Sequence, residues 1–284
     1  MGHVLNCKEA AKVFLDNIKM ESEKLREKGV NPLLAIVRVG KREDDIAYEK
    51  SILKNCEKVN ITGQVHECDE NIDMESFTKL IQGLNQDRFV HGILVFRPLP
   101  KHLDENVIKH IIDPNKDVDC MNPLNFARIF EGDLDGYLPC TPAAVMNIIK
   151  YFNIDVKGKK VVVLGRSMVV GKPLAMMLLK EDATVTICHS KTENLKEVVS
   201  SADIVAAAIG KAKFIGSDYI KKDAIVIDVG INVDDNGNLC GDVDFEAVKE
   251  KASLITPVPG GVGSVTTSVL LKNVINGAKR IHKS

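Results

Sequence analysis

Residues 159–189 read KKVVVLGRSMVVGKPLAMMLLKEDATVTICH, and this stretch decides the fold. Lys160–Leu164 is a short, β-branched apolar run that is typical of a buried parallel strand, and it ends at Gly165. The apolar segment LAMMLLK follows, with Pro173 placed in the first turn of a predicted helix. A second strand is predicted at Thr184–Cys188. Strand, Gly-rich turn, helix and strand in succession present backbone N–H groups and a helix N-terminus to a pyrophosphate.

The turn Gly165–Gly171 departs from the dinucleotide fingerprint G-x-G-x-x-G, because Ser167 stands at the middle glycine and one residue is added. Spacing alone therefore fits a nucleotide site and an ordinary tight turn equally well. After the second strand, the segment 188–192 (CHSKT) has no carboxylate that could hold a ribose 2′-hydroxyl. A serine, a lysine and the nearby Arg166 suit a 2′-phosphate instead, which predicts NADP rather than NAD.

Composition limits the class of protein. The 284 residues carry 38 Lys and Arg against 39 Asp and Glu, so net charge gives no reason to expect nucleic acid or an anionic membrane as partner. Seven cysteines are spread along the chain without a C-x-x-C pair, which argues against a zinc site or a disulfide framework and for a reducing compartment. We expect a soluble, cytoplasmic protein without a metal, since no apolar run approaches the length of a membrane span.

Strands and helices alternate in the first half of the chain, which predicts a parallel α/β sheet there. The predicted elements are a helix at 7–28, a strand ending at Gly40, a helix at 45–59, the strand TGQVHEC, the helix MESFTKLIQGLNQ and a strand at 91–96.

A polar, Gly-bearing segment, EGDLDGYLPCTP, is the predicted domain boundary. We expect a first domain over residues 1–140 and a Rossmann-type second domain over 141–263, with strands near 160–164, 184–188, 204–208 and 224–229. A C-terminal helix over 264–284 is expected to pack back on the first domain. The prediction is two α/β lobes with parallel sheets and a cleft between them, where ligands meet the carboxyl ends of the strands.

Eight segments together resemble the methylenetetrahydrofolate dehydrogenase/cyclohydrolase family, in the order and spacing of its motifs. They are VGKREDDIAYEKSILKNCEKVNI, HGILVFRPLPKHLDE, PNKDVDCMNP, LPCTP, GRSMVVGKP, TICHSKT, IVIDVGIN and TPVPGGVGSVT. The resemblance implies a homodimer whose folate-bearing first domain faces an NADP-binding second domain. It also implies two reactions, the oxidation of methylene- to methenyltetrahydrofolate by hydride transfer and the hydrolysis of the methenyl product to 10-formyltetrahydrofolate.

The resemblance also implies site residues. Tyr48 falls on the tyrosine that stacks on the folate ring system, and Asp119 on the carboxylate that hydrogen-bonds the pterin; these two are the expected catalytic residues. Cofactor binding falls on Gly165, Arg166, Ser167, Val170, Gly171, Pro173, Ser190, Lys191 and Ile231. The loop that closes over the reacting centre falls on Pro259, Gly260, Gly261 and Val262. From the residues alone, Tyr48 could equally be amphipathic surface, Asp119 a turn cap, and the glycines a backbone requirement.

Three positions break the family pattern: Asp45 replaces a serine, Ile52 a lysine and Phe96 a glutamine. That lysine is credited with the hydrolytic reaction, and isoleucine can neither hold nor transfer a proton. Lys50 and Lys54 lie on another side of the same helix from Tyr48. Hydride transfer depends on position and on the cofactor, so we expect a working dehydrogenase with weak or absent cyclohydrolase activity.

Two other functions stay open at this point. One is a folate- or NADP-binding regulator whose chemistry has decayed, although its cofactor turn is intact. The other is a shikimate-type NADP dehydrogenase, which would need a Lys–Asp pair in the first domain.

Overall fold

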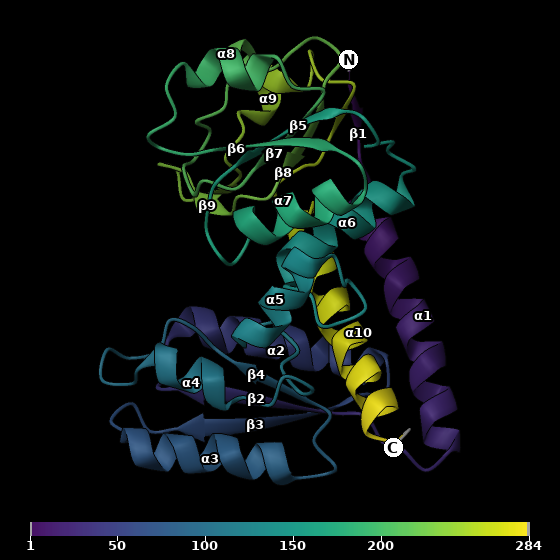
Figure 1. Ribbon diagram of the computed structural model, residues 1–284, viewed down its shortest axis with the longest axis vertical. Coiled ribbons are helices and arrows are strands. Elements are labelled where there is room, and N and C mark those ends of the chain that lie inside the picture. Colours follow the sequence, from purple (N-terminus) through teal and green to yellow (C-terminus); the bar gives the residue numbers. More distant parts are fainter. Residues whose placement is uncertain (1, 283–284) are drawn as a thin grey trace. The chain divides into compact units, whose positions relative to one another are not determined.

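The computed structural model describes residues 2–282. By its internal contacts the chain divides into two compact units. The six-strand unit contains residues 2–12, Ile129–Asp133 and Pro139–Thr266, and the three-strand unit contains Val13–Arg128, Leu134–Leu138 and 267–282. Both are built on parallel sheets, as the sequence predicts (Figure 1).

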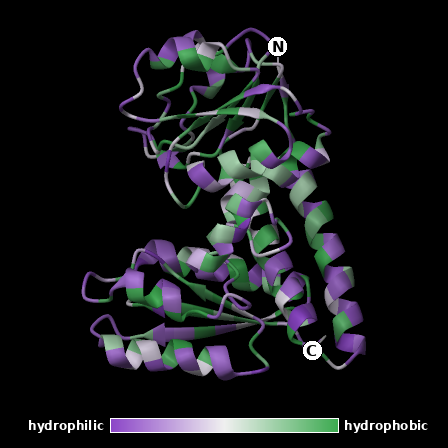
Figure 2. Cartoon of the chain, viewed as in Figure 1, coloured by the Kyte–Doolittle hydropathy of each residue, from purple (hydrophilic) through white to green (hydrophobic). Residues whose placement is uncertain are grey.

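The three-strand unit is built on β2 (Leu33–Val39), β3 (Thr62–Cys68) and β4 (Gly92–Val95), in the order β3-β2-β4. Central β2 is apolar apart from Arg38 and almost wholly buried, which is typical of a strand covered on both faces. Edge strand β3 is coloured as hydrophilic in Figure 2, because polar and apolar side chains alternate along it. The strands thus place their carboxyl ends, and the loops that follow them, at one edge of the sheet.

Helices cover both faces of this sheet. On one face, Val37 packs with Phe77 of α3 (Met74–Gln86) and Ile108 of α4 (Glu105–Ile111). On the other face, the strand backbone at Gly63 and at Gly92 comes so close to neighbouring side chains that a Cβ would not fit without a shift. A Cβ on Gly63 would stand 2.5 Å from Leu53 of α2 (Glu43–Lys58), and one on Gly92 would stand 3.1 Å from Val274 of α10 (Gly263–Ile281). In Figure 1, α3 runs beneath the sheet and α2 lies above it.

The six-strand unit has a parallel sheet in the order β1-β11-β8-β7-β5-β6. Its strands are β1 (His3–Val4), β5 (Lys160–Leu164), β6 (Thr184–Cys188), β7 (Ile204–Ala207), β8 (Ile225–Asp228) and β11 (Leu254–Ile255). Around them lie α6 (Cys140–Tyr151), α7 (Gly171–Lys180), α8 (Leu195–Ser200), the 3₁₀ turn η1 (Ser217–Tyr219), α9 (Phe245–Val248) and the hairpin of β9 (Asn232–Val233) with β10 (Leu239–Cys240). The order reverses between β5 and β7, which is where such sheets bind ligands.

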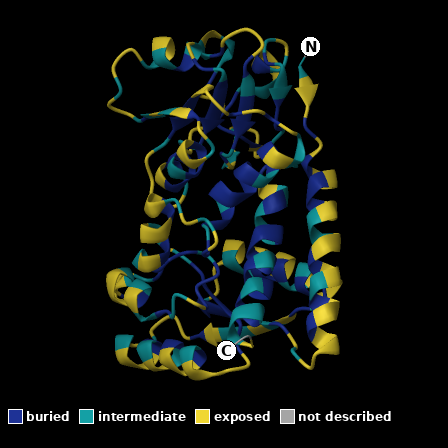
Figure 3. Ribbon diagram, turned by 45° about the vertical axis from the view of Figure 1, so that its right-hand side comes forward, coloured by how far each residue is buried: buried dark blue, intermediate teal, exposed yellow. Residues whose placement is uncertain are grey.

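Three helices have residues in both units: α1 (Cys7–Glu27), α5 (Pro123–Glu131) and α10. In Figure 3 the central strands are largely dark blue and the outer face of α1 is exposed, consistent with the charged residues of its sequence. No helix was expected over α5, and the short strands β1, β9, β10 and β11 were also not expected. Residues 2–12 lie in the six-strand unit, although the sequence analysis grouped them with the first domain, because β1 pairs with β11 through His3 and Val4.

Candidate active site

The turn after β5 is shaped by two glycines. Gly165 has a φ of +122°, and a Cβ on it would stand 2.3 Å from the carbonyl oxygen of Ala208. A Cβ on Gly171, the first residue of α7, would stand 2.0 Å from the carbonyl oxygen of Gly165. Ser167 stands at the absent middle glycine, and its Oγ accepts a hydrogen bond from the Val170 N–H at 3.1 Å. The backbone of the turn therefore lies directly against the start of α7, where N–H groups can face a ligand. Pro173 is buried in the first turn of that helix.

A pocket of about 290 Å³ lies at the carboxyl ends of β5, β6 and β7. Four of the expected cofactor residues line it: Gly165, Arg166, Ser167 and Ser190. A glycine cradle, a helix N-terminus and an exposed guanidinium fit the phosphates of a dinucleotide. The observed residues thus suit an NADP-type cofactor, and Arg166 and Ser190 line the same pocket.

Other expected cofactor residues do not line this pocket. Three of them belong to the turn and to the start of α7 and do not line the pocket: Val170, Gly171 and Pro173. Lys191 is exposed, and its backbone N–H donates to Nδ1 of His189 at 3.1 Å. Ile231 lies after β8, in a second pocket of about 230 Å³.

Ile231 shares that second pocket with the whole expected closing loop: Pro259, Gly260, Gly261 and Val262. The loop glycines also meet a backbone demand, since Gly260 has a φ of +98° and a Cβ on Gly261 would stand 2.1 Å from the Pro257 carbonyl oxygen. The same glycines therefore line a pocket and also allow a backbone shape that other residues would not adopt.

Sequence reasoning missed several residues that line this pocket, among them a lysine and an aromatic residue. Lys211 and Phe214 line it from the loop after β7, and the Lys211 Nζ lies 5.2 Å from the centroid of the Phe214 ring. The available signal was their position directly after a buried strand, at the same sheet edge as the glycine turn. Lys211 adds a second cation to the one that Arg166 supplies.

The same loop is held by a buried carboxylate that the sequence analysis did not identify. Asp242 accepts hydrogen bonds from three consecutive backbone N–H groups, those of Ile209 (2.6 Å), Gly210 (3.2 Å) and Lys211 (2.8 Å). Its Oδ1 also accepts from the side-chain amide of Asn232 at 3.0 Å. Asp242 therefore fixes the backbone from which Lys211 enters the pocket.

A second carboxylate, Asp228 at the end of β8, organises the neighbouring loops. It accepts from the backbone N–H groups of Gly230 (3.1 Å), Asp242 (3.0 Å) and Val243 (3.0 Å). Burial, opposed by these hydrogen bonds and helped by the charge of Asp242, raises the pKa of Asp228 to about 7. Asp228 also lines the pocket of the closing loop.

In the three-strand unit, the expected substrate residue Tyr48 lies in the first half of α2. The ring of Tyr48 is half-exposed and lies 5.5 Å from that of Phe96, centroid to centroid, with the planes inclined by 31°. Ile52, one turn further along α2, is fully buried, as is nearly all of Phe96. The lysine and glutamine positions of the family are therefore parts of an apolar wall beside Tyr48.

The motif Lys116-Asp117-Val118-Asp119 separates into structural and exposed residues. The Lys116 ammonium donates to the carbonyl oxygens of Leu84, Asn85 and Asp87, and Asp117 is buried and accepts from the N–H groups of Met121 and Asn122, both at 2.8 Å. Burial raises the pKa of Asp117. Asp119 instead stays half-exposed and pairs with Arg97 at 3.2 Å, directly after Phe96.

A buried guanidinium fixes α2 beside these residues. The Nε of Arg38, on β2, lies 2.8 Å from Glu49, and its Nη2 lies 3.1 Å from Glu67 on β3. Because Glu49 directly follows Tyr48, this network holds the backbone that carries the tyrosine.

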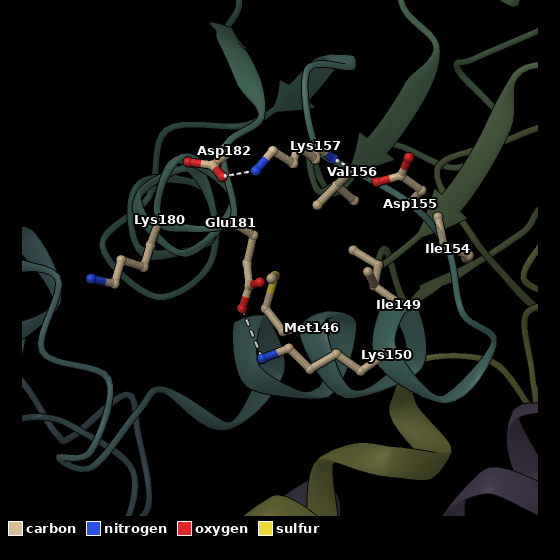
Figure 4. A pocket seen from close by; sticks show the side chains of 10 residues that line it. All are labelled: Met146, Ile149, Lys150, Ile154, Asp155, Val156, Lys157, Lys180, Glu181 and Asp182. Carbon is tan, nitrogen blue, oxygen red and sulfur yellow. Dashed lines mark hydrogen bonds and ion pairs between the residues drawn. The ribbon is translucent and has the colours of Figure 1, made fainter.

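A third pocket, of about 250 Å³, lies between α6, the loop after it and the end of α7 (Figure 4). Its charged rim is closed by two ion pairs, Lys150–Glu181 at 2.8 Å and Lys157–Asp182 at 3.1 Å. None of the expected site residues lines it, so we assign it no part in the site.

Comparison with known proteins gives matches along the whole chain. Residues 5–119 match the family model for the tetrahydrofolate dehydrogenase/cyclohydrolase catalytic domain, and residues 139–282 match that for the NAD(P)-binding domain of the same family. A relative from Clostridium botulinum (strain Okra / Type B1), "Bifunctional protein FolD", is 58% identical over 280 residues, which are 99% of each chain.

Two solved structures are similar throughout. The bifunctional enzyme FolD from Campylobacter jejuni has a TM-score of 0.97 and 41% identity, covering 99% of both chains. The FolD of Trypanosoma brucei, solved with NADP cofactor and inhibitor, has a TM-score of 0.94 and 35% identity, covering 100% of this chain and 99% of that one. Within residues 2–282, the helices are too short or too polar to span a membrane.

Proposed function

We propose that this chain, which belongs to the tetrahydrofolate dehydrogenase/cyclohydrolase family, transfers a hydride from 5,10-methylenetetrahydrofolate to NADP⁺ and so forms 5,10-methenyltetrahydrofolate. One observation carries the proposal: Arg166 and Ser190 share a pocket with the Gly165 turn. A hydroxyl, a guanidinium and close-approaching backbone are what a phosphorylated dinucleotide requires.

Residue roles follow from exposure and partners. Tyr48 would stack on the folate ring system, since its ring is half-exposed and held in place by Phe96. Asp119 would accept hydrogen bonds from the N–H groups of the pterin, exchanging its pairing with Arg97 for them. NADP⁺, when bound, supplies the hydride acceptor. The residues of the chain bind and orient the two reactants, with the loop Pro259–Val262 covering the reacting centre.

We propose further that hydrolysis of methenyltetrahydrofolate is weak. Ile52 and Phe96 offer no proton and no hydrogen bond to an attacking water, and their apolar surfaces disfavour its presence. The bifunctional name of the Clostridium botulinum relative points the other way, toward both activities in that protein. A rate measurement on this chain is therefore needed to decide between the two.

The test is a spectrophotometric time course with purified protein, methylenetetrahydrofolate and either NADP⁺ or NAD⁺. We expect reduced cofactor to form faster with NADP⁺, in step with accumulating methenyltetrahydrofolate. Loss of methenyltetrahydrofolate above its spontaneous rate would contradict the proposal of weak hydrolysis. It would leave the proposal of a dehydrogenase intact. No reduced cofactor with either nucleotide would contradict the dehydrogenase and favour a binding protein.

The shikimate-type alternative is not favoured, because the matches to folate enzymes extend over the whole chain. A homodimer, implied by the family, remains a proposal that sedimentation equilibrium would test.

A further inference from the structure

Asp45 differs from the other acidic residues at the start of α2. Glu43, Asp44 and Asp45 all lie in its first turn, where carboxylates favour the helix dipole. The Asp44 side chain is 67% exposed, whereas that of Asp45 is only 14% exposed. A helix start is served equally well by an exposed carboxylate, so stabilisation of the helix does not explain why most of the Asp45 side chain is covered.

The position of Asp45 on the helix brings it to the proposed substrate site. Tyr48 follows it by three residues and Ile52 by seven, so all three share one face of α2. Tyr48 is in contact with Phe96 on this face, and Ile52 is buried. Asp44, four residues before Tyr48, also lies on this side of the helix, so exposure and not spacing distinguishes Asp45 from it.

The charge of Asp45 is only weakly compensated. Arg42 Nε lies 3.7 Å from Asp45 Oδ2, but the same guanidinium donates two hydrogen bonds to Asp44. Arg38, the other cation that acts on Asp45, is engaged by Glu49 and Glu67. Burial raises the pKa of Asp45 in spite of both cations. The site therefore holds a partly desolvated carboxylate with capacity for a further positive charge.

The proposed reaction creates such a charge. In methylenetetrahydrofolate the one-carbon bridge between N5 and N10 is neutral. Its C–H bond breaks, the hydrogen leaves with both bonding electrons for the nicotinamide of NADP⁺, and no proton is released. The folate is oxidised by two electrons and becomes the methenyl cation, whose positive charge is shared by N5, the bridge carbon and N10, while NADP⁺ is reduced to NADPH.

We propose that Asp45 is a catalytic residue whose carboxylate stabilises the positive charge that develops on the folate as the hydride leaves. This inference rests on the proposed function. A fixed negative charge beside a developing cation lowers the barrier because the interaction is stronger in the transition state than with the neutral substrate. Ile52 and Phe96 complement it, since neither adds a competing positive charge.

The test compares Asp45→Asn with Asp44→Asn, which removes the same charge from the exposed neighbour in the same turn. We expect Asp45→Asn to lower kcat for hydride transfer about tenfold with little change in KM for NADP⁺, and Asp44→Asn to change kcat less than about twofold. Asp45→Glu, which keeps the charge, should recover part of the rate. Thermal unfolding of each variant identifies any loss that comes from misfolding.

A second readout needs no turnover. Stopped-flow fluorescence measures the affinity for the methenyl cation, before it hydrolyses, and for neutral tetrahydrofolate. Asp45→Asn should weaken binding of the cation about tenfold and leave the neutral folate nearly unchanged. Equal effects on both folates, or an unchanged preference for the cation, would overturn the role of Asp45. A wild-type protein that binds the cation preferentially but reduces no NADP⁺ would instead overturn the proposed function.

Discussion

The ring of Phe96 lies 5.5 Å from the ring of Tyr48, and the two planes are inclined by 31°. Phe96 follows β4, and Tyr48 stands on α2 one turn before Ile52, which is fully buried. The proposed folate platform is thus bordered by apolar surface on the side where the family has lysine and glutamine. An apolar border suits hydride transfer, which needs orientation and dryness, and opposes the addition of water.

Restoring the polar pair should restore hydrolysis. We expect the double variant Ile52→Lys/Phe96→Gln to hydrolyse methenyltetrahydrofolate several-fold faster than the wild type, because an amine that can transfer a proton, with an amide to pair with it, then stands one turn from Tyr48. Ile52→Lys alone should destabilise the fold by about 3 kcal/mol, since its ammonium would be buried without a partner. Methenyl decay and urea unfolding measure the two effects. Ile52→Met, of similar length but without an amine, is the control, and equal hydrolysis by both variants would contradict the argument.

The two aspartates of the motif at 116–119 should separate stability from activity. Asp117→Asn should cost about 1–3 kcal/mol of unfolding free energy, because an amide nitrogen replaces one carboxylate oxygen and the buried N–H group of Met121 or of Asn122 then loses its acceptor. Asp119→Asn should change stability by less than about 0.5 kcal/mol, since its pairing with Arg97 is half-exposed. It should nevertheless lower kcat/KM for the folate at least about tenfold, as expected for a substrate contact. The assignment is wrong if Asp119→Asn destabilises the fold and leaves kcat/KM unchanged.

Sequence patterns located the regular part of the fold well. The expected helix at 7–28 is α1 (Cys7–Glu27), and the strands at 160–164 and 184–188 are β5 and β6 with the same bounds. Apolar periodicity and flanking glycines determine such elements locally. Strand β1, by contrast, has two exposed residues and exists only because it pairs with β11, more than two hundred residues away in the chain.

The candidate site also has features that are set by local sequence and features that depend on distant parts of the chain. Its glycine turn could be identified from the sequence, because the pattern of glycines is local. Asp228 and Asp242 could not be, since their significance lies in backbone N–H groups that the fold brings to them from three loops. The distinction between Asp117 and Asp119 likewise depends on burial, which two aspartates in one short motif do not reveal.

Gly171 should be irreplaceable for cofactor binding. In Gly171→Ala the added methyl would stand 2.0 Å from the Gly165 carbonyl oxygen, so the turn must shift. We expect the affinity for NADP⁺, measured by calorimetry, to fall at least about tenfold. Gly83→Ala in α3 meets nothing within 4 Å and should stabilise the protein by about 0.5–1 kcal/mol with unchanged affinity. Normal NADP⁺ binding by Gly171→Ala would show that the turn is not the cradle.

Arg166 should set the choice between the two nicotinamide cofactors. It lines the pocket together with Ser190, and the strand before Ser190 ends without a carboxylate for a ribose hydroxyl. Arg166→Ala should raise KM for NADP⁺ about tenfold or more and change KM for NAD⁺ less than about twofold, because only NADP⁺ has a 2′-phosphate. Steady-state kinetics with both cofactors give the ratio. Lys191→Ala serves as comparison, because Lys191 does not line the pocket, and an equal loss for both cofactors would mean that Arg166 binds the shared pyrophosphate.

Asp228 should make stability depend on pH in a defined direction. Its pKa is raised to about 7 in the folded protein, above the ordinary value of 3.8, so between these values the folded state holds a proton that the unfolded state has lost. The contribution of this group to the unfolding free energy is therefore complete below the lower pKa and is lost as pH rises through the upper one. In urea unfolding at a series of pH values from about 5 to about 8, the stability of the wild type relative to Asp228→Asn should fall steadily. Asp244→Asn, which alters the residue before α9 whose carboxylate accepts from the Ala247 N–H, is the comparison variant. If the difference between wild type and Asp228→Asn stays constant over that range, Asp228 is ionised throughout, and its three backbone hydrogen bonds outweigh burial and the charge of Asp242.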